Sequence, residues 1–122
     1  MDALKKQVGG THYKKGYQPI SLICKLQMNF VQGNILKYPS RFADKNGKED
    51  LQKAVHYCQL GCELNPLNVA VFSRREALKY VQKNSLPIDF VEFIEEICNQ
   101  NWLFCSSYIL RLSEAAYKDS KL

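Results

Sequence analysis

The fold class is decided by the stretch KEDLQKAVHYCQLGCEL, residues 48–64. Its apolar residues repeat at the three- and four-residue spacing of one helix face. They are Leu51, Ala54, Val55, Cys58 and Cys62. Two acids, Glu49 and Asp50, stand in the first turn, where a carboxylate stabilises the helix dipole. The turn sequence DKNGK precedes the stretch and NPLN follows it, so we predict one helix over residues 48–64.

Helix signals recur on both sides of this stretch. Pro19 suits the first turn of a helix, and Ser73 with Glu76 has the spacing of a capping box. The predicted helices cover about residues 20–29, about 30 onward, 48–64, 73–83, 87–99 and 102–117. Short connections between them predict an all-α fold, a compact bundle of about five to six helices. The segment VAVF, residues 69–72, either extends the fourth helix backward or forms a short extended piece.

The composition is that of a single globular domain. At 122 residues the chain is long enough for one core, and 46% of its residues are hydrophobic. No apolar run approaches the roughly 20 residues that a membrane-spanning helix needs. The first ten residues, MDALKKQVGG, lack the apolar segment of a secretory signal. We therefore predict one domain over residues 1–122, no contact with a membrane, and a cytoplasmic location.

The five cysteines are predicted to be free thiols. An odd number in a chain without an export signal argues against a disulfide framework. Cys58 and Cys62 lie one helical turn apart, a spacing that suits a metal, but no CxxC pair accompanies them. Burial in the core is the better interpretation of both, and no metal site is predicted.

The positive charge lies in the first half of the chain. Residues 1–53 contain ten Lys or Arg and four Asp or Glu, whereas residues 54–122 contain seven and eight, which accounts for the net charge of +5. Such asymmetry is typical of a protein with an anionic partner: a nucleotide, a nucleic acid or a membrane surface. A solvated basic face without a partner is the alternative, and charge alone does not separate the two.

Two helix stripes concentrate polar groups of the kind that bind phosphate. On the second predicted helix, helical spacing brings Asn34, Lys37, Tyr38 and Arg41 onto one stripe. Arg presents a bidentate fork, Lys a point charge, and Asn both a donor and an acceptor. Pro39 interrupts this helix: it either ends the helix near Tyr38, or kinks it and turns Arg41 toward a ligand.

The helix over residues 48–64 repeats the arrangement. Asp50, Lys53 and Tyr57 fall on one stripe beside its apolar face. If the two helices pair as a hairpin, both stripes line one cleft, in which the tyrosines stack a base while the cations hold phosphate. The alternative is an ordinary amphipathic pair whose Lys and Arg side chains snorkel to solvent.

The N-terminal arm, rich in Gly, Lys and Tyr and predicted to be irregular, is a third candidate. It contains VGGTHYKKG, residues 8–16, whose glycines let backbone N–H groups approach a phosphate closely. His12 can donate a hydrogen bond or titrate near neutral pH. The Walker A signature is absent, so the pattern is not that of a P-loop. An arm without a ligand, common at chain ends, is the alternative.

Three ordered blocks of sequence resemble a known family. The blocks are VGGTHY (8–13), GNILKYPSR (33–41) and KNGKEDLQKAVHY (45–57), and the resemblance covers about residues 8–60. They are similar to a family of small bacteriophage proteins called domain of unknown function 3310, whose members are often described as phage nucleotide kinases. Pro39 departs from the family pattern, where an aliphatic residue is expected. Residues 61–122, a helical remainder, carry no resemblance of this kind.

The resemblance implies a phage origin, a nucleotide-related role and a set of motif residues. These are Gly10, His12, Tyr13, Asn34, Lys37, Tyr38, Arg41, Asp50, Lys53 and Tyr57. In the predicted site, Gly10 and His12 join Asn34 and the three cations as ligands of phosphate. Tyr13 joins the two helix tyrosines in stacking a base, Asp50 supports the site, and no residue is assigned as catalytic.

The sequence leaves three candidate functions open. The first, which we favour, is a noncatalytic homo-oligomeric binder that needs no cofactor. It would sequester a nucleotide, or a linear or cyclic nucleotide immune signal, in the cytosol of an infected host cell. The second is a nucleoside monophosphate kinase without a P-loop, which would require two nucleotide sites and Mg²⁺. The third is a binder of single-stranded nucleic acid, since basic charge and tyrosines suit stacking on single strands.

Overall fold

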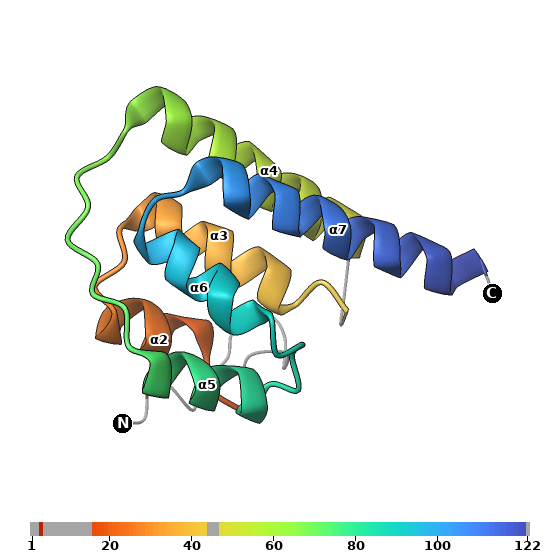
Figure 1. Ribbon diagram of the computed structural model, residues 1–122, viewed down its shortest axis with the longest axis horizontal. Helices are drawn as coiled ribbons and strands as arrows, with labels where there is room; N and C mark the ends of the chain where they lie inside the picture. The colour runs from red at the N-terminus through yellow and green to blue at the C-terminus, as the bar shows by residue number, and fades with distance from the viewer. Residues whose placement is uncertain (1–2, 4–15, 44–46, 122) are drawn as a thin grey trace.

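The computed structural model describes residue 3, residues 16–43 and residues 47–121, with the backbone alone for residues 116–121. Within these residues the chain forms six α-helices and no strand (Figure 1). They are α2 (Pro19–Lys25), α3 (Phe30–Ser40), α4 (Gly47–Leu64), α5 (Arg74–Lys83), α6 (Phe90–Cys98) and α7 (Trp102–Lys121). The prediction of a compact all-α fold is confirmed.

The helices are arranged as two layers of three. In the first layer α3 packs against both α2 and α4, and in the second α6 packs against both α5 and α7. Each helix of the first layer also packs against one helix of the second: α2 against α5, α3 against α6, and α4 against α7. α4 and α7 lie side by side and run in opposite directions (Figure 1). The core therefore forms at the seam between the two layers.

The seam is filled with aliphatic and aromatic side chains. Ile35 and Leu36 of α3 and Phe93 and Ile97 of α6 are fully buried. Phe93 stacks on Tyr108 of α7, with ring centroids 4.6 Å apart. Burial of each such side chain stabilises the fold by about 1.5–3 kcal/mol. This packing sets the position of α3, and with it the position of the polar stripe on the opposite side of that helix.

The first described helix is shorter than predicted. α2 ends at Lys25 rather than near residue 29, because Gln27 adopts a φ of 58° at which a right-handed helix cannot continue. Asn29 then opens α3 with a capping box: its side chain accepts from the Gln32 N–H, and the Gln32 side chain accepts from the Asn29 N–H. The predicted start near Phe30 is confirmed, although its cap was not anticipated.

The predicted capping box at Ser73 is half correct. Ser73 accepts a hydrogen bond from the Glu76 N–H at 3.2 Å, which caps α5. The Glu76 carboxylate does not return the bond, because it accepts from the Tyr17 hydroxyl at 2.8 Å and pairs with Lys25 at 3.4 Å. The hydrogen bond from Tyr17 lowers the pKa of Glu76. These contacts join α5 to α2 across the two layers.

The boundaries in the second layer differ modestly from those predicted. α6 begins at Phe90 rather than at Pro87, because residues 88–89 form a turn. α7 continues to Lys121, beyond the predicted end near residue 117. No helix in the part of the chain that the structure describes is long and apolar enough to cross a membrane.

The connection between α4 and α5 is extended. Residues 65–73 contain no helix, so VAVF takes the second of its two predicted forms. Side-chain amides fix this segment: Asn29 donates to the Leu67 carbonyl at 3.1 Å, and Gln100 donates to the Pro66 carbonyl at 3.0 Å. The amide of Gln32, which is fully buried, donates to the Asn68 side-chain oxygen at 3.0 Å. The segment is therefore held against the ends of both layers.

The structure places three cysteines inside and two outside. Cys58, Cys98 and Cys105 are buried, whereas Cys24 and Cys62 are exposed. The prediction that Cys62 is buried together with Cys58 is therefore wrong, because Trp102 of α7 packs on the neighbouring Gly61 and leaves Cys62 exposed. Burial raises the pKa of the Cys58 and Cys98 thiols to about 11. Of the described residues, no group of three potential ligands is placed to hold a metal.

Gly61 allows α4 and α7 to approach closely. A Cβ atom added at this position would lie 2.7 Å from the Trp102 ring, which is closer than real Cβ contacts permit. The indole of Trp102 therefore packs directly on the backbone of α4 at the end of the α4–α7 pair. Any larger residue at position 61 must displace either the ring or the helix.

Candidate functional site

Three cationic groups surround the ring of Tyr38. The Lys37 Nζ lies 5.1 Å from the ring centroid, the Arg41 Cζ 5.1 Å and the Lys53 Nζ 5.3 Å. Each distance is within the range of a cation–π interaction, which attracts a cation to the ring face by about 0.5–2 kcal/mol. Lys37 comes from α3, Arg41 directly follows that helix, and Lys53 comes from α4, so the packing of the two helices assembles the cluster. The hairpin expected from the sequence does bring the two polar stripes together.

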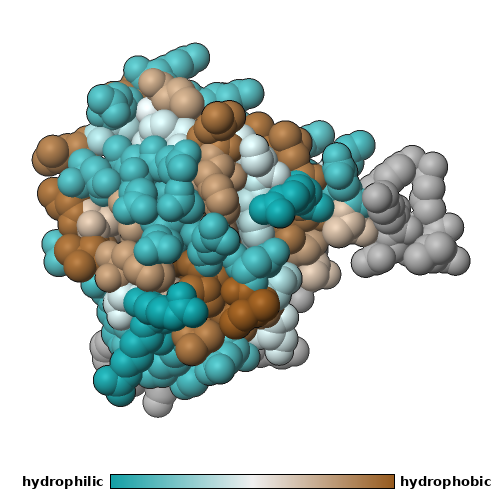
Figure 2. Space-filling view, viewed as in Figure 1, coloured by the Kyte–Doolittle hydropathy of each residue, from teal (hydrophilic) through white to brown (hydrophobic). Residues whose placement is uncertain are grey.

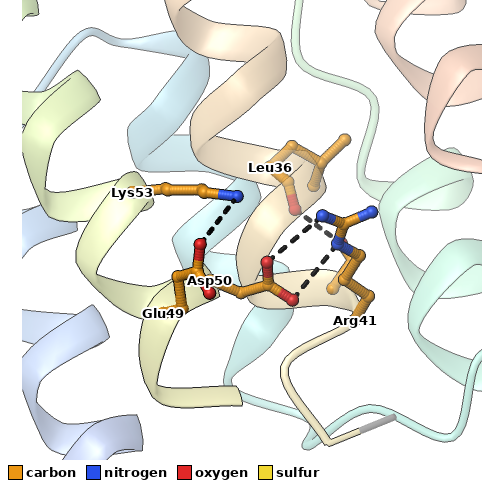
Figure 3. A network of polar contacts seen from close by, with 6 residues as sticks. Leu36, Arg41, Glu49, Asp50 and Lys53 are labelled. Atoms are coloured by element: carbon orange, nitrogen blue, oxygen red, sulfur yellow. Dashed lines mark hydrogen bonds and ion pairs between the residues drawn. The ribbon is translucent and has the colours of Figure 1, made fainter. Parts of the chain in front are cut away.

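Arg41 forms a bidentate ion pair with Asp50. Its Nε donates to Oδ2 and its Nη2 donates to Oδ1, both at 3.2 Å (Figure 3). The Asp50 side chain is 1% exposed and the Arg41 side chain is 19% exposed, so the pair is largely buried. A fork-shaped pair of this kind is among the stronger charged hydrogen bonds in proteins. It joins the end of α3 to the start of α4 across the intervening turn.

Pro39 does not end α3 at Tyr38, which answers the question left open by the sequence. The helix continues to Ser40, and Arg41 is its C-cap, with its N–H bonded to the Tyr38 carbonyl at 3.3 Å. The Ser40 hydroxyl donates to the Leu36 carbonyl at 2.6 Å and so supports the last turn. Tyr38 and Arg41 therefore keep a helical relationship, and both reach the same cluster.

The two lysines of the cluster differ in their acidic partners. Lys53 pairs with Glu49 at 3.5 Å, but the side chains are 42% and 62% exposed, so water screens the pair strongly (Figure 3). Among the residues that the structure describes, no carboxylate lies within ion-pair distance of Lys37. Lys37 also borders a small hollow of about 230 Å³ beside Pro19, Ile20 and Ile23. The cluster therefore retains positive charge that Glu49 and Asp50 do not cancel.

Aromatic rings continue from the cation cluster along the same surface. Tyr38 stacks on Tyr57 with centroids 6.2 Å apart and planes inclined by 17°. Phe30 meets Tyr57 edge-on at 6.0 Å, and its side chain is 75% exposed. Sequence reasoning missed Phe30, although it precedes Asn34 by four residues and so falls on the same stripe of α3.

An open groove of about 450 Å³ lies beside these rings. Its lining consists of Tyr38, Glu49, Gln52, Lys53, His56 and Tyr57. Gln52 and His56 were not among the predicted site residues, although both lie within one turn of Lys53 on α4. Their amide and imidazole groups can donate and accept hydrogen bonds at the edge of a planar ligand.

The remaining predicted residues fall into two groups. Asn34 uses its side-chain N–H to bond the Phe30 carbonyl at 2.8 Å, so one of its donors is already engaged within α3. Gly10, His12 and Tyr13 lie outside the described residues. The arrangement that the structure does provide is a surface where cations, rings and a shallow groove adjoin, which suits a ligand that is both anionic and planar.

The class of protein is thus an all-α fold whose first layer carries a cationic and aromatic surface. Comparison with protein families finds a match over residues 8–59 to a family described as protein of unknown function, DUF3310. The match confirms, for this segment, the resemblance that the three sequence blocks predicted. No curated protein and no solved structure matches the chain. Every described residue of the cation cluster lies within the matched segment.

Proposed function

We propose that the protein binds a nucleotide through its phosphate groups and sequesters it without chemical change. The observation that supports this most directly is the convergence of three cationic groups on Tyr38, one of them, Lys37, without an acidic partner among the described residues. Bringing like charges together costs free energy unless an anion offsets their repulsion. A phosphate group between the two lysines would provide that anion.

In this proposal the phosphate and the base occupy adjoining parts of the surface. Lys37 and Lys53 contact the phosphate, with Asn34 beside them on α3. The base lies against Tyr57 and the exposed ring of Phe30, within reach of the polar groups of Gln52 and His56. Tyr38 holds the cations rather than the base, since the cationic groups already lie over its ring.

Arg41 has a supporting role in this site. Its fork is engaged by Asp50, so a phosphate would have to compete with a buried carboxylate for the same guanidinium. We therefore assign direct phosphate contact to the lysines. Arg41 and Asp50 together fix the hairpin that brings Lys37 and Lys53 to one ring.

Sequestration fits this site better than phosphoryl transfer. A kinase must place two nucleotides and hold a metal ion with carboxylates. Glu49 and Asp50, the acids of the cluster, each face a cation of the protein instead.

The family resemblance adds a phage origin to the proposal. The ligand would then be a nucleotide immune signal, linear or cyclic, bound in the cytoplasm of the infected cell.

Single-stranded nucleic acid is a second candidate ligand. The succession of rings from Phe30 to Tyr57 to Tyr38, beside an open groove, is an arrangement on which consecutive bases can stack. The two ligands differ in their salt dependence, since an oligonucleotide that contacts several cations releases several counterions.

A ligand screen tests the proposal. The protein is mixed with mono-, di-, tri- and cyclic nucleotides, its melting temperature is measured, and each ligand is recovered by chromatography after incubation with ATP and Mg²⁺. Stabilisation by one nucleotide that is recovered intact supports sequestration. Conversion of a monophosphate to a diphosphate would establish a kinase instead. Stabilisation by oligonucleotides alone, with a steep dependence on salt, would favour the second candidate.

A further inference from the structure

A second hollow borders the cation cluster, on the α2 side of α3. It has a volume of about 230 Å³ and is lined by Gln18, Pro19, Ile20, Ile23 and Lys37. The groove of about 450 Å³ described above lies on the α4 side, and Tyr38 and Lys53 belong to its lining. The two lysines that the proposed function assigns to phosphate therefore line different hollows.

The two hollows flank α3 because this helix packs against α2 on one side and against α4 on the other. Adjacent residues of a helix point about 100° apart, so Lys37 lines the hollow beside α2 while Tyr38 lines the groove beside α4. Packed helix axes lie about 8–10 Å apart, and the two hollows are separated by a similar distance. The Nζ atoms of Lys37 and Lys53 both lie over the Tyr38 ring, so the cation cluster stands between the hollows.

The hollow beside α2 is apolar apart from Lys37 and Gln18. Ile20 is 51% exposed, whereas Ile23 is partly buried against the core. Ile23 packs on the backbone of α3 at Gly33, where an added Cβ atom would lie 3.2 Å from the Ile23 Cδ1. Exposed apolar residues elsewhere are dispersed among polar ones, as the face in Figure 2 shows. Ile20 differs from them because it lines a hollow together with a cation.

The size and charge of this hollow restrict its occupant. Pockets for complete drug-sized ligands measure about 300–1,000 Å³, so a hollow of 230 Å³ admits a planar fragment such as a base rather than a whole nucleotide. The described residues that line it include Lys37 and no carboxylate, which suits a fragment attached to an anion. Building on the proposed nucleotide site, we propose that the ligand is a dinucleotide, two nucleosides joined through phosphate.

Each part of a dinucleotide has its own place on this surface. The joining phosphate lies between Lys37 and Lys53, the first base lies against Tyr57 and Phe30, and the second base lies on Ile20. Stacked bases are about 3.4 Å apart, so bases on opposite sides of α3 are splayed rather than stacked on each other. A mononucleotide fills one hollow only. Because the two bases are linked, binding of the first raises the effective concentration of the second.

Titration calorimetry with matched ligands tests the proposal. The panel contains mononucleotides of the common bases and the corresponding dinucleotides with a linear phosphodiester, a linear diphosphate or a cyclic diester linkage. At least one dinucleotide is expected to bind about tenfold or more tightly than its mononucleotide, and the preferred linkage identifies the ligand class. Equal affinity for mononucleotides and all dinucleotides would overturn the dinucleotide and leave the proposed function standing. Absence of binding by any nucleotide would overturn both.

Substitutions in the two hollows separate the contributions of the two bases. Ile20→Ala should weaken binding of the preferred dinucleotide by about tenfold and leave mononucleotide binding unchanged, because it reduces only the second hollow. Phe30→Ala should weaken both. Ile88→Ala, at a position 70% exposed in the turn before α6 and outside both hollows, is the matched control and should weaken neither.

Two results with Ile20→Ala would contradict the second base position: an unchanged affinity for the dinucleotide, or an equal loss for dinucleotide and mononucleotide. Melting temperatures and circular dichroism spectra that match the wild type establish that each variant is folded.

Discussion

The guanidinium of Arg41 and the carboxylate of Asp50 are joined by two hydrogen bonds of 3.2 Å although the turn between α3 and α4 separates them in sequence. The pair ties the C-cap residue of α3 to the first turn of α4. Because Lys37 lies on α3 and Lys53 on α4, a contact that does not itself need to touch a ligand supports the geometry of the candidate site.

Asp50→Asn is expected to destabilise the fold by about 3 kcal/mol, because it leaves the Arg41 charge partly buried without its partner. Urea unfolding measures the change. Glu49→Gln removes the neighbouring carboxylate from an exposed pair and should cost less than about 0.5 kcal/mol. Equal effects of the two substitutions would show that the Arg41–Asp50 pair does not support the hairpin.

Lys37→Ala and Lys53→Ala are each expected to weaken nucleotide binding by about tenfold or more, since a hydrogen bond to a charged group is worth about 1.5–3 kcal/mol. Titration calorimetry measures the affinity. Both side chains are partly exposed, so the melting temperature of the free protein should change little. Lys83→Ala, an exposed lysine on α5, is the control for net charge. Unchanged affinity in both site variants would reject the cluster as the phosphate site.

Phe30→Ala separates base stacking from phosphate contact. The ring is 75% exposed, so its removal should leave stability nearly unchanged. Stacking on an aromatic ring is worth about 1–3 kcal/mol per base, which predicts at least a several-fold loss of affinity for nucleotides. Inorganic pyrophosphate has no base, and its binding should be unaffected. An equal loss of affinity for nucleotide and for pyrophosphate would show that Phe30 does not stack on the base.

Gly61→Ala is expected to destabilise the α4–α7 pair by about 1–3 kcal/mol, the usual cost of overpacking. The added methyl group would meet the Trp102 ring. Because Trp102 is the single tryptophan of the chain, its fluorescence reports the displacement directly. A variant with wild-type stability and an unshifted emission spectrum would show that the ring does not rest on the backbone of α4.

Thiol labelling should separate the cysteines into two sets. At pH 8 the exposed Cys24 and Cys62 are expected to react with a thiol reagent, while the three buried thiols react only after unfolding. Burial raises the pKa of Cys58 from 9.0 to about 11, so the folded state holds this proton more tightly than the unfolded state does. Its contribution to stability is complete below pH 9 and is lost as the pH rises toward 11. Rapid native labelling of all five would contradict the described packing.

Features with a local cause were predictable from the sequence. The course of α4, the start of α3 and the N-cap at Ser73 follow from spacing, turn residues and caps within a few positions of one another. The stripes on α3 and α4 were also found, because helical periodicity alone places Lys37, Tyr38 and Lys53.

Features that depend on how helices pack were not predictable. Arg41 was expected to bind a ligand, and its pairing with Asp50 appears only once the hairpin sets their distance. The Glu76 carboxylate does not complete the expected capping box, because it accepts a hydrogen bond from the hydroxyl of Tyr17, which lies 59 residues earlier in the sequence. The exposure of Cys62 likewise depends on where α7 crosses α4 rather than on any local pattern.

The two-layer arrangement has a consequence for how such a chain can change through evolution. The family match ends at residue 59, near the end of the first layer, while the second layer chiefly supplies apolar cover for α2, α3 and α4. Many sequences can provide cover of that kind, so the second layer is the replaceable part. A relative that retained only the first layer would expose Ile35 and Leu36 to water, and it would need another chain to cover these side chains.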